Sequence, residues 1–269
     1  SSAVVRFVGD LHLGDGAHND TFGKQDERLL AFLTDCGRSC DALVFMGDTY
    51  DVPQALTFAR VLSAHAAVTA AIRDLAHRIE VIFVRGNHDW HVDYEGAFGG
   101  ARAVDRMTVG DALVMHGHQL DRYCDPERRL HRLHILLHHL AERFLGFHFR
   151  VPLFHHDSLR NRVGHWLGNQ YGRHLRRMAR VHRFLHDEAR AHACEAFIHY
   201  WSRSVWGDPQ AMFAPIRSFL ERGQHSALVC GHTHLPGVVA FKERTYVNAG
   251  SWTFGASQYA TWNGHAFSV

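Results

Sequence analysis

The most constraining feature of this sequence is a short apolar segment that runs directly into a carboxylate. Residues 42–46 read Ala-Leu-Val-Phe-Met, and Gly47 and Asp48 follow at once. A short apolar run of this kind is typical of a buried strand, so Asp48 is expected at a partly desolvated strand end. A buried carboxylate costs free energy unless a cation pairs with it. We therefore expect Asp48 to bridge two metal ions.

The same pattern recurs four more times along the chain. The segments 3–9, 80–84, 112–115 and 227–230 are also predicted strands that end in polar residues. The five motifs are Asp10-x-His12, Gly47-Asp48-x-x-Asp51, Gly86-Asn87-His88-Asp89, His116-Gly117-His118 and Gly231-His232-x-His234. Helices predicted at about 24–37 and 54–76 separate the first three strands, which favours α/β layering. Because ligands gather beyond the carboxyl ends of such strands, the motifs are expected to converge.

The regular alternation stops at residues 119–222, which are predicted to be mostly helical. From Arg122 to His192 there are 14 Arg and no Lys against 6 acidic residues, although the whole chain has a net charge of only +2. The rest of the chain is therefore net acidic. We expect a core formed by residues 1–118 and 223–269 to carry a basic helical insert or cap at 119–222. Its apolar stripes, such as Leu133, Leu137 and Phe144, are predicted to pack internally.

Cysteine usage and hydropathy favour the cytoplasm. The five cysteines are odd in number and form no CxxC pair, which fits a reducing compartment. No apolar run approaches the roughly 20 residues that a membrane span needs. No basic-then-apolar signal segment opens the chain.

The five motifs together offer carboxylates, imidazoles and one amide oxygen, but no thiolate. That mixture suits divalent Mn, Fe or Zn. There are too many ligands for one ion, whereas two ions about 3.5–4 Å apart can share a hydroxide and clamp a phosphoryl group. Any one motif alone has an ordinary explanation, such as an Asx turn or one unremarkable histidine among 25. Their common order and strand-end placement favour the metal site.

In this order the motifs resemble those of the calcineurin-like metallophosphoesterase superfamily, over Val4–Met115 and Ser226–Trp252. The resemblance implies a four-layer α/β/β/α sandwich with a helical insertion and a centre of two divalent ions, with Mn expected first and Fe or Zn as alternatives. It implies that one ion is held by Asp10, His12 and His234, the other by Asn87, His116 and His232, and that Asp48 bridges them. His118 and Asp51 are secondary candidates. His88 would contact the leaving group beside Asn87, oriented by a hydrogen bond to Asp89.

Two branches of the superfamily can be compared with this chain. Phosphoprotein phosphatases carry GDxVDRG and GNHE, whereas here Val52-Pro53 follows Asp51 and the third motif ends in Asp89. The chain is more similar to the UDP-2,3-diacylglucosamine pyrophosphohydrolases of lipid A synthesis. The shared features are the Asp10-Leu11-His12-Leu13 start, the helical insertion after the fourth motif and the Tyr246-x-Asn248-x-Gly250-x-Trp252 segment. It departs from that group at three places. The group has GNRD where this chain has Gly86-Asn87-His88-Asp89, HGD where it has His116-Gly117-His118, and GDW where it has Gly250-Ser251-Trp252.

The implied function is metal-dependent hydrolysis of a phosphodiester, pyrophosphate or phosphomonoester bond. The substrate would be a UDP-2,3-diacylglucosamine-like lipid-linked nucleotide or another small phosphate compound. The arginine-rich insert also suits an anionic membrane, which would place the protein in the cytoplasm, peripheral to the inner membrane. A nuclease or cyclic-nucleotide phosphodiesterase is the alternative, less favoured because no Lys-rich runs or interleaved aromatic residues occur. A non-catalytic scaffold, like the retromer subunit of this fold, is disfavoured by the complete ligand set.

Overall fold

Two stacked β-sheets form the centre of the computed structural model, which describes residues 3–121, 124, 126–127, 129–145, 159–195 and 214–269. The first sheet has the order β11-β10-β1-β2-β3-β4 and the second the order β5-β6-β7-β9-β8. The strands are β1 (Val5–Val8), β2 (Ala42–Phe45), β3 (Glu80–Val84), β4 (Arg102–Val104), β5 (Arg106–Val109), β6 (Ala112–Met115), β7 (Ala227–Cys230), β8 (Gly237–Phe241), β9 (Arg244–Asn248), β10 (Ala260–Trp262) and β11 (Phe267–Ser268).

Strand direction brings the polar motifs to one edge. β1, β2 and β3 pair in parallel, with Val5 opposite Ala42 and Ala42 opposite Glu80. In the second sheet β6, β7 and β9 are parallel as well. The carboxyl ends of β1, β2 and β3 therefore lie together, as do those of β6 and β7. These are the strands that the sequence predicted to end in polar motifs.

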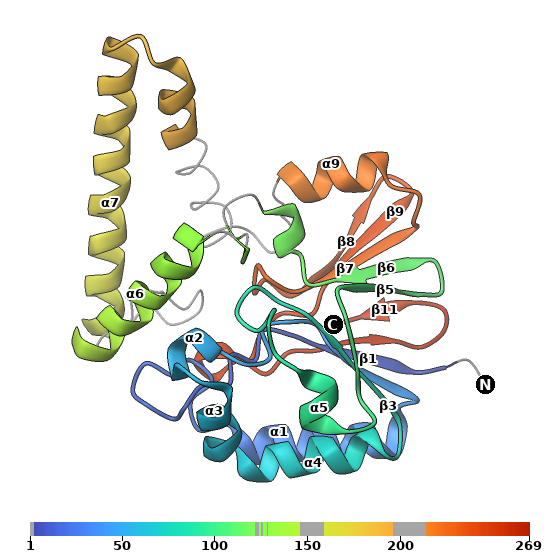
Figure 1. Ribbon diagram of the computed structural model, residues 1–269. Helices are drawn as coiled ribbons and strands as arrows, with labels where there is room; N and C mark the ends of the chain where they lie inside the picture. The colour runs from blue at the N-terminus through green and yellow to red at the C-terminus, as the bar shows by residue number, and fades with distance from the viewer. Residues whose placement is uncertain (1–2, 122–123, 125, 128, 146–158, 196–213) are drawn as a thin grey trace.

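Side-chain alternation along the strands builds three apolar layers between four layers of structure. Ala42, Val44 and Met46 face the second sheet, whereas Leu43 and Phe45 face the opposite way. That outer face packs against helices α1 (Asp26–Ser39) and α4 (Ala66–Ala76). The outer face of the second sheet is covered by α9 (Ala214–Arg222) (Figure 1). The predicted α/β/β/α sandwich is confirmed.

The prediction of a single helix at 54–76 is wrong, because three separate helices occupy this region. These are α2 (Val52–Ala55), α3 (Phe58–Ala64) and α4. Leu56 adopts a left-handed backbone with φ of 69°, and the Thr57 side chain then caps the next helix by accepting a hydrogen bond from the Arg60 N–H. The second break falls at His65, where α3 ends and α4 begins.

His65 links this break to helix α1 through a buried ion pair. Its Nδ1 lies 2.7 Å from Asp26 Oδ1, and its Nε2 lies 3.9 Å from Asp20 Oδ2. Burial alone would lower the pKa of His65, but the contacts with Asp20 and Asp26 outweigh burial and raise it. His65⁺ therefore stabilises the fold fully below its unfolded pKa of about 6.5, and this contribution disappears as pH rises through the raised folded pKa.

His65→Gln is therefore expected to destabilise the protein in a pH-dependent way. The free energy of unfolding should fall by about 1.5–3 kcal/mol at about pH 5.5, the scale of a hydrogen bond to a charged group, and by less above the raised folded pKa. Urea denaturation in EDTA across this pH range measures the difference. The exposed His77→Gln variant is the control, and a loss for His65→Gln that does not change with pH would contradict the charged pair.

Most of the described part of the insert is helical, and its longest helices are α6 (Arg129–Leu145) and α7 (Leu159–Phe184). Residues 146–158 and 196–213 of the predicted insert lie outside the described residues, and its boundaries stay a prediction. The expectation that its apolar stripes pack fails for part of α6, although Leu136 and Leu140 of the same stripe are half-buried. Leu133, Leu137 and Phe144 are 50%, 55% and 83% exposed, because their side of the helix faces away from the core. None of the described helices is long and apolar enough to cross a membrane.

Candidate metal centre

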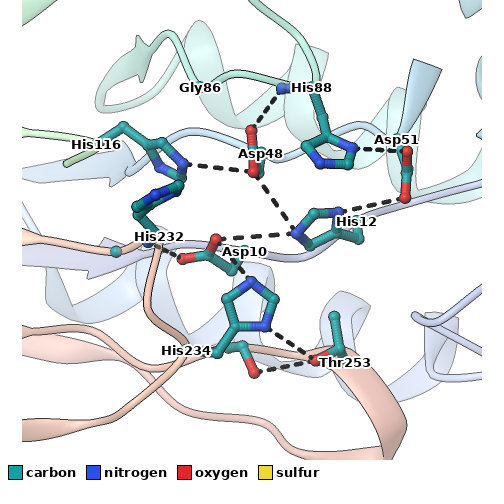
Figure 2. A network of polar contacts seen from close by, with 12 residues as sticks. Asp10, His12, Asp48, Asp51, Gly86, His88, His116, His232, His234 and Thr253 are labelled. Atoms are coloured by element: carbon teal, nitrogen blue, oxygen red, sulfur yellow. Dashed lines mark hydrogen bonds and ion pairs between the residues drawn. The ribbon is translucent and has the colours of Figure 1, made fainter. Parts of the chain in front are cut away.

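Four strand ends from two sheets bring their polar side chains to one point. Asp10 and His12 follow β1, Asp48 follows β2, His116 follows β6, and the pair His232 and His234 follows β7 (Figure 2). The first four of these side chains are almost completely buried. Two groups have ligand atoms close enough to hold metal ions: Asp10, His12 and His234, and Asp48, His116 and His232. A third group, His12, Asp48 and His88, shares one residue with each of them.

The two central carboxylates are held by backbone amides in matching ways. Asp10 Oδ2 accepts a hydrogen bond of 2.8 Å from the His232 N–H, and Asp48 Oδ1 accepts one of 2.8 Å from the His88 N–H. The other oxygen of each carboxylate faces the imidazoles. His12 Nε2 lies 3.8 Å from Asp10 Oδ1 and 3.7 Å from Asp48 Oδ2, and so stands between the two acids. Asp10 Oδ1 and Asp48 Oδ2 therefore both point toward the space between the imidazoles.

The imidazoles are fixed through the nitrogen that points away from this space. The Nδ1 atom of His12 hydrogen-bonds Asp51 Oδ2 at 3.3 Å, and that of His116 donates to the Met46 carbonyl at 2.7 Å. His234 Nδ1 lies 3.5 Å from Thr253 Oγ1. In all three rings Nε2 is directed at a carboxylate oxygen of Asp10 or Asp48. Tethering of one ring nitrogen is how proteins aim the other at a metal ion.

Several of the converging atoms have no hydrogen-bond partner among the described residues. They are Asp10 Oδ1, His12 Nε2, Asn87 Oδ1 and His116 Nε2, all buried. Leaving buried polar atoms without hydrogen bonds costs about 1–3 kcal/mol each. A set of oxygen and nitrogen donors in this state fits borderline or hard divalent ions and lacks thiolate. The residues therefore fit two such cations, with Asp48 placed between both groups.

Backbone strain is concentrated at the same residues. Asp10, His12, Asp48, His232 and His234 all have positive φ, between 47° and 65°, although none is glycine. Such conformations cost about 1–3 kcal/mol each and persist where function requires them. The glycines of the motifs allow close approach: a Cβ on Gly86 would overlap the Asp48 carboxylate, and a Cβ on Gly231 would overlap that of Asp10.

The two histidines of the fourth motif are placed differently. His116 Nε2 lies 3.4 Å from Asp48 Oδ2, whereas the His118 ring sits 5.4 Å from the His116 ring and joins no candidate metal group. His232 is anchored through Nε2, which lies 3.0 Å from Asp121 Oδ2, so its Nδ1 is left for a ligand. The structure thus groups His116 rather than His118 with Asp48, and the division of ligands between two ions stays a prediction.

The carboxylate that contacts His88 is Asp51, not Asp89. His88 Nδ1 hydrogen-bonds Asp51 Oδ1 at 2.9 Å, while His88 keeps some solvent exposure. The prediction that Asp89 orients His88 is wrong, because its carboxylate is occupied by other donors. Asp89 accepts hydrogen bonds from the backbone N–H groups of Thr49, Tyr50 and Gly86 and from the Tyr94 hydroxyl. Burial and the Asp48 charge raise the pKa of Asp89 to about 6, and its role is to tie the second and third motifs together.

The electrostatics of the site call for a cation. Burial raises the pKa of Asp48, but the charges of His116, His88 and His12 outweigh this and hold it well below its usual range. Burial lowers the pKa of His116, while Asp48 and Asp10 raise it to about 10. His116 thus holds a proton against Asp48 in the absence of another cation. Because a ligating imidazole must be deprotonated, this proton and a metal ion exclude each other.

Four contributors were not predicted from the sequence: Asp121, Thr253, His139 and Glu142. Asp121 and Thr253 stand behind His232 and His234. His139 and Glu142 belong to α6, and His139 Nε2 lies 3.2 Å from Asp51 Oδ1. No local pattern marks these residues, since each reaches the site only through contacts between distant segments.

A known protein family matches most of the chain. The Calcineurin-like phosphoesterase family matches residues 3–236. No curated protein matches the chain. Among solved structures, it is similar to a dimetal phosphatase from Danio rerio, at 13% identity over 97% of this chain and 92% of that one, with a TM-score of 0.45.

Two further solved structures are similar to the chain. One is Yfce, a phosphoesterase from E. coli, at 15% identity over 99% of this chain and 91% of that one, with a TM-score of 0.41. The other is the nuclease MPE from Pseudomonas putida, at 24% identity over 42% of this chain and 53% of that one, with a TM-score of 0.31. The family match covers most of the chain and includes all five motifs, and the chain therefore belongs to the calcineurin-like phosphoesterase family.

Proposed function

We propose that this metal-dependent phosphoesterase hydrolyses the pyrophosphate bond of a lipid-linked nucleotide of the UDP-2,3-diacylglucosamine kind. The observation that carries the hydrolytic part is the convergence of buried donors without hydrogen-bond partners at Asp10, His12, Asn87 and His116. Asp10, His12 and His234 would hold one cation, and His116 and His232 the other, with Asp48 between them. The family resemblance adds Asn87, whose Oδ1 is buried without a hydrogen-bond partner among the described residues, to the second set. Two bound divalent ions, Mn²⁺ first and Fe or Zn as alternatives, supply Lewis-acid activation of water and neutralise phosphoryl charge.

The chain's own residues would handle the leaving group. His88 is a partly exposed imidazole of the site, and Asp51 fixes it through Nδ1. Its Nε2 would face the leaving oxygen and donate a proton to it, which typically contributes about 10²–10⁴-fold in rate. A complete donor set with an oriented acid favours an enzyme over a scaffold.

The lipid part of the proposal is supported by the surface of the insert. Of the large hydrophobic side chains that are exposed in the described residues, most lie on or beside α6 and α7: Leu133, Leu137, Phe144, Leu145, Val181, Phe184 and Leu185. Soluble monomers rarely expose such patches without a ligand or membrane to cover them. Acyl chains, and an anionic leaflet of the inner membrane facing the cytoplasm, would cover this surface and pair with its arginines.

A nuclease is the second candidate, and one feature supports it. Arg173, Arg176, Arg177, Arg180 and Arg183 line one hollow of about 430 Å³ along α7, with Glu195 as the acid beside them. Such a row could track a phosphodiester backbone. The aliphatic residues beside it have no role in binding phosphates, so the lipid substrate is favoured.

A hydrolysis panel with Mn²⁺ tests the proposal. UDP-2,3-diacylglucosamine, the same nucleotide sugar without acyl chains, bis-p-nitrophenyl phosphate and single-stranded DNA are compared as substrates, with anionic and zwitterionic vesicles added in separate arms. We expect the acylated compound to show a kcat/KM about 100-fold or more above the unacylated one, since a few buried methylenes suffice for that ratio. Faster cleavage of DNA than of UDP-2,3-diacylglucosamine would favour a nuclease over a hydrolase of lipid-linked nucleotides. If the protein sediments with neither vesicle type, the proposed membrane binding is rejected.

A further inference from the structure

The insert helix α6 contributes a buried histidine to the candidate metal centre, and we infer that His139 is a positioning residue for His88. This inference rests on the proposed function only for its rate measurements. His139 is 2% exposed, and its Nε2 lies 3.2 Å from the same Asp51 oxygen that accepts a hydrogen bond from His88 Nδ1. The His88 and His139 rings meet edge to face, with centroids 5.8 Å apart and an angle of 85° between planes.

Asp51 is the hub that gives His139 its effect. Its Oδ2 takes the hydrogen bond of His12, and its Oδ1 faces both His88 and His139. Asp51 also accepts a hydrogen bond from the Gln54 N–H at the start of α2. A buried carboxylate needs all of these donors. Loss of His139 would remove one contact from Asp51 Oδ1, so the His88 ring, which shares that oxygen, would settle in a new position, while Oδ2 keeps its contact with His12.

Helix α6 is docked firmly enough to make this contact a fixed part of the site. Arg143 pairs with Asp15 at 2.7 Å and donates to the Gln54 carbonyl at 3.3 Å. Two side chains of the loop after β1, His18 and Asn19, bond the backbone carbonyls of Glu142 and His139. Figure 1 shows α6 lying beside α2, the helix that Asp51 caps.

A second carboxylate, that of Glu142, lies near the other ring nitrogen of His139. Glu142 is fully buried, with Oε2 3.9 Å from His139 Nδ1 and Oε1 3.2 Å from His138 Nε2. His139 is thus placed between two acids, Asp51 in the core and Glu142 in its own helix. The distance to Glu142 is too long for a hydrogen bond, so the shorter contact with Asp51 is the one that fixes the direction of Nε2.

Variants of His139 test the inference by kinetics. His139→Leu and the shorter His139→Asn both withdraw the donor from Asp51, whereas the amide of His139→Gln can reach it. We expect Leu and Asn to lower kcat about 10- to 100-fold on a substrate with a poor leaving group, with KM and metal content unchanged. Turnover of bis-p-nitrophenyl phosphate, whose leaving group needs little protonation, should change much less. His139→Gln should recover most of the loss.

A spectroscopic measurement makes the result independent of any substrate. In protein labelled with ¹⁵N-histidine, the His88 Nδ1–H resonance is identified by its absence in His88→Ala. It should shift or vanish through exchange in His139→Leu and His139→Asn, but stay in place in the control His77→Gln, which changes an exposed histidine. Equal losses on both substrates, or an unchanged His88 resonance, would reduce His139 to a packing role. Inactivity of the wild type on every phosphate ester with a shifted resonance in the variants would instead reject the proposed function and retain the positioning role.

Discussion

Asp48→Asn is expected to reduce bound metal from two ions per chain to one or none and to lower turnover by about 10³-fold or more, since metal ions contribute several kcal/mol to such reactions. The substitution keeps the volume of the buried side chain. Its amide oxygen can still accept the hydrogen bond from the His88 N–H. Its NH₂ group would then face His12 and His116, where Asp48 Oδ2 now lies. An N–H donor, which cannot bind a cation, thus replaces the carboxylate oxygen that lies between the two groups of metal ligands.

Elemental analysis after dialysis, together with a steady-state assay in Mn²⁺, measures both effects. Asp105→Asn is the matched control, because that carboxylate is 80% exposed and pairs only with Arg85 among the described residues. Two tightly bound ions and normal turnover in Asp48→Asn would overturn the assignment of Asp48 as the shared ligand. Circular dichroism separates loss of metal from loss of fold.

The second large effect is expected at His88. His88→Asn should keep both metal ions, because His88 contributes its backbone N–H to Asp48 and its ring to Asp51. Turnover of substrates with poor leaving groups should fall about 10²–10⁴-fold, the usual contribution of a general acid. With a p-nitrophenolate leaving group, which departs without a proton, the loss should be much smaller.

A Brønsted series of aryl phosphodiesters checks this expectation. The dependence of log kcat on leaving-group pKa should be steeper in His88→Asn than in the wild type. His91→Asn is the control, since His91 is an exposed histidine in the same loop. Parallel slopes would show that His88 binds phosphate without transferring a proton, and loss of metal would make it a ligand instead.

The sequence pointed to Asp89 as the acid that orients His88, whereas in the structure Asp51 contacts the His88 ring. Both Asp51 and Asp89 lie close to His88 along the chain or in a neighbouring motif, and sequence distance favoured Asp89. In the structure, Asp89 accepts hydrogen bonds from Thr49 and Tyr50 of the second motif, and so is turned away from the His88 ring. Asp51 reaches His88 across 37 residues because β2 and β3 are paired in parallel.

Histidine environments were equally beyond the reach of the sequence. The residues His116, His232 and His234 could be named as candidate ligands, but not the ring nitrogen that each presents. That choice depends on the Met46 carbonyl, Asp121 and Thr253, which bind the opposite nitrogen. The involvement of α6 was also missed, because the insert was treated as a cap rather than as a source of the Asp51 contact from His139.

The sequence by itself indicated α/β layering and the candidate side chains at the strand ends, and the family resemblance supplied the α/β/β/α sandwich. Strand periodicity and the polar residues that follow each strand are local properties, and parallel pairing places all such strand ends at one edge. Only the tertiary structure decided that Asp51 is the hub for His12, His88 and His139, and that Asp121 stands behind His232. The physical reason is that hydrogen bonds between segments far apart in the chain depend on how helices and loops pack, which no residue pattern records.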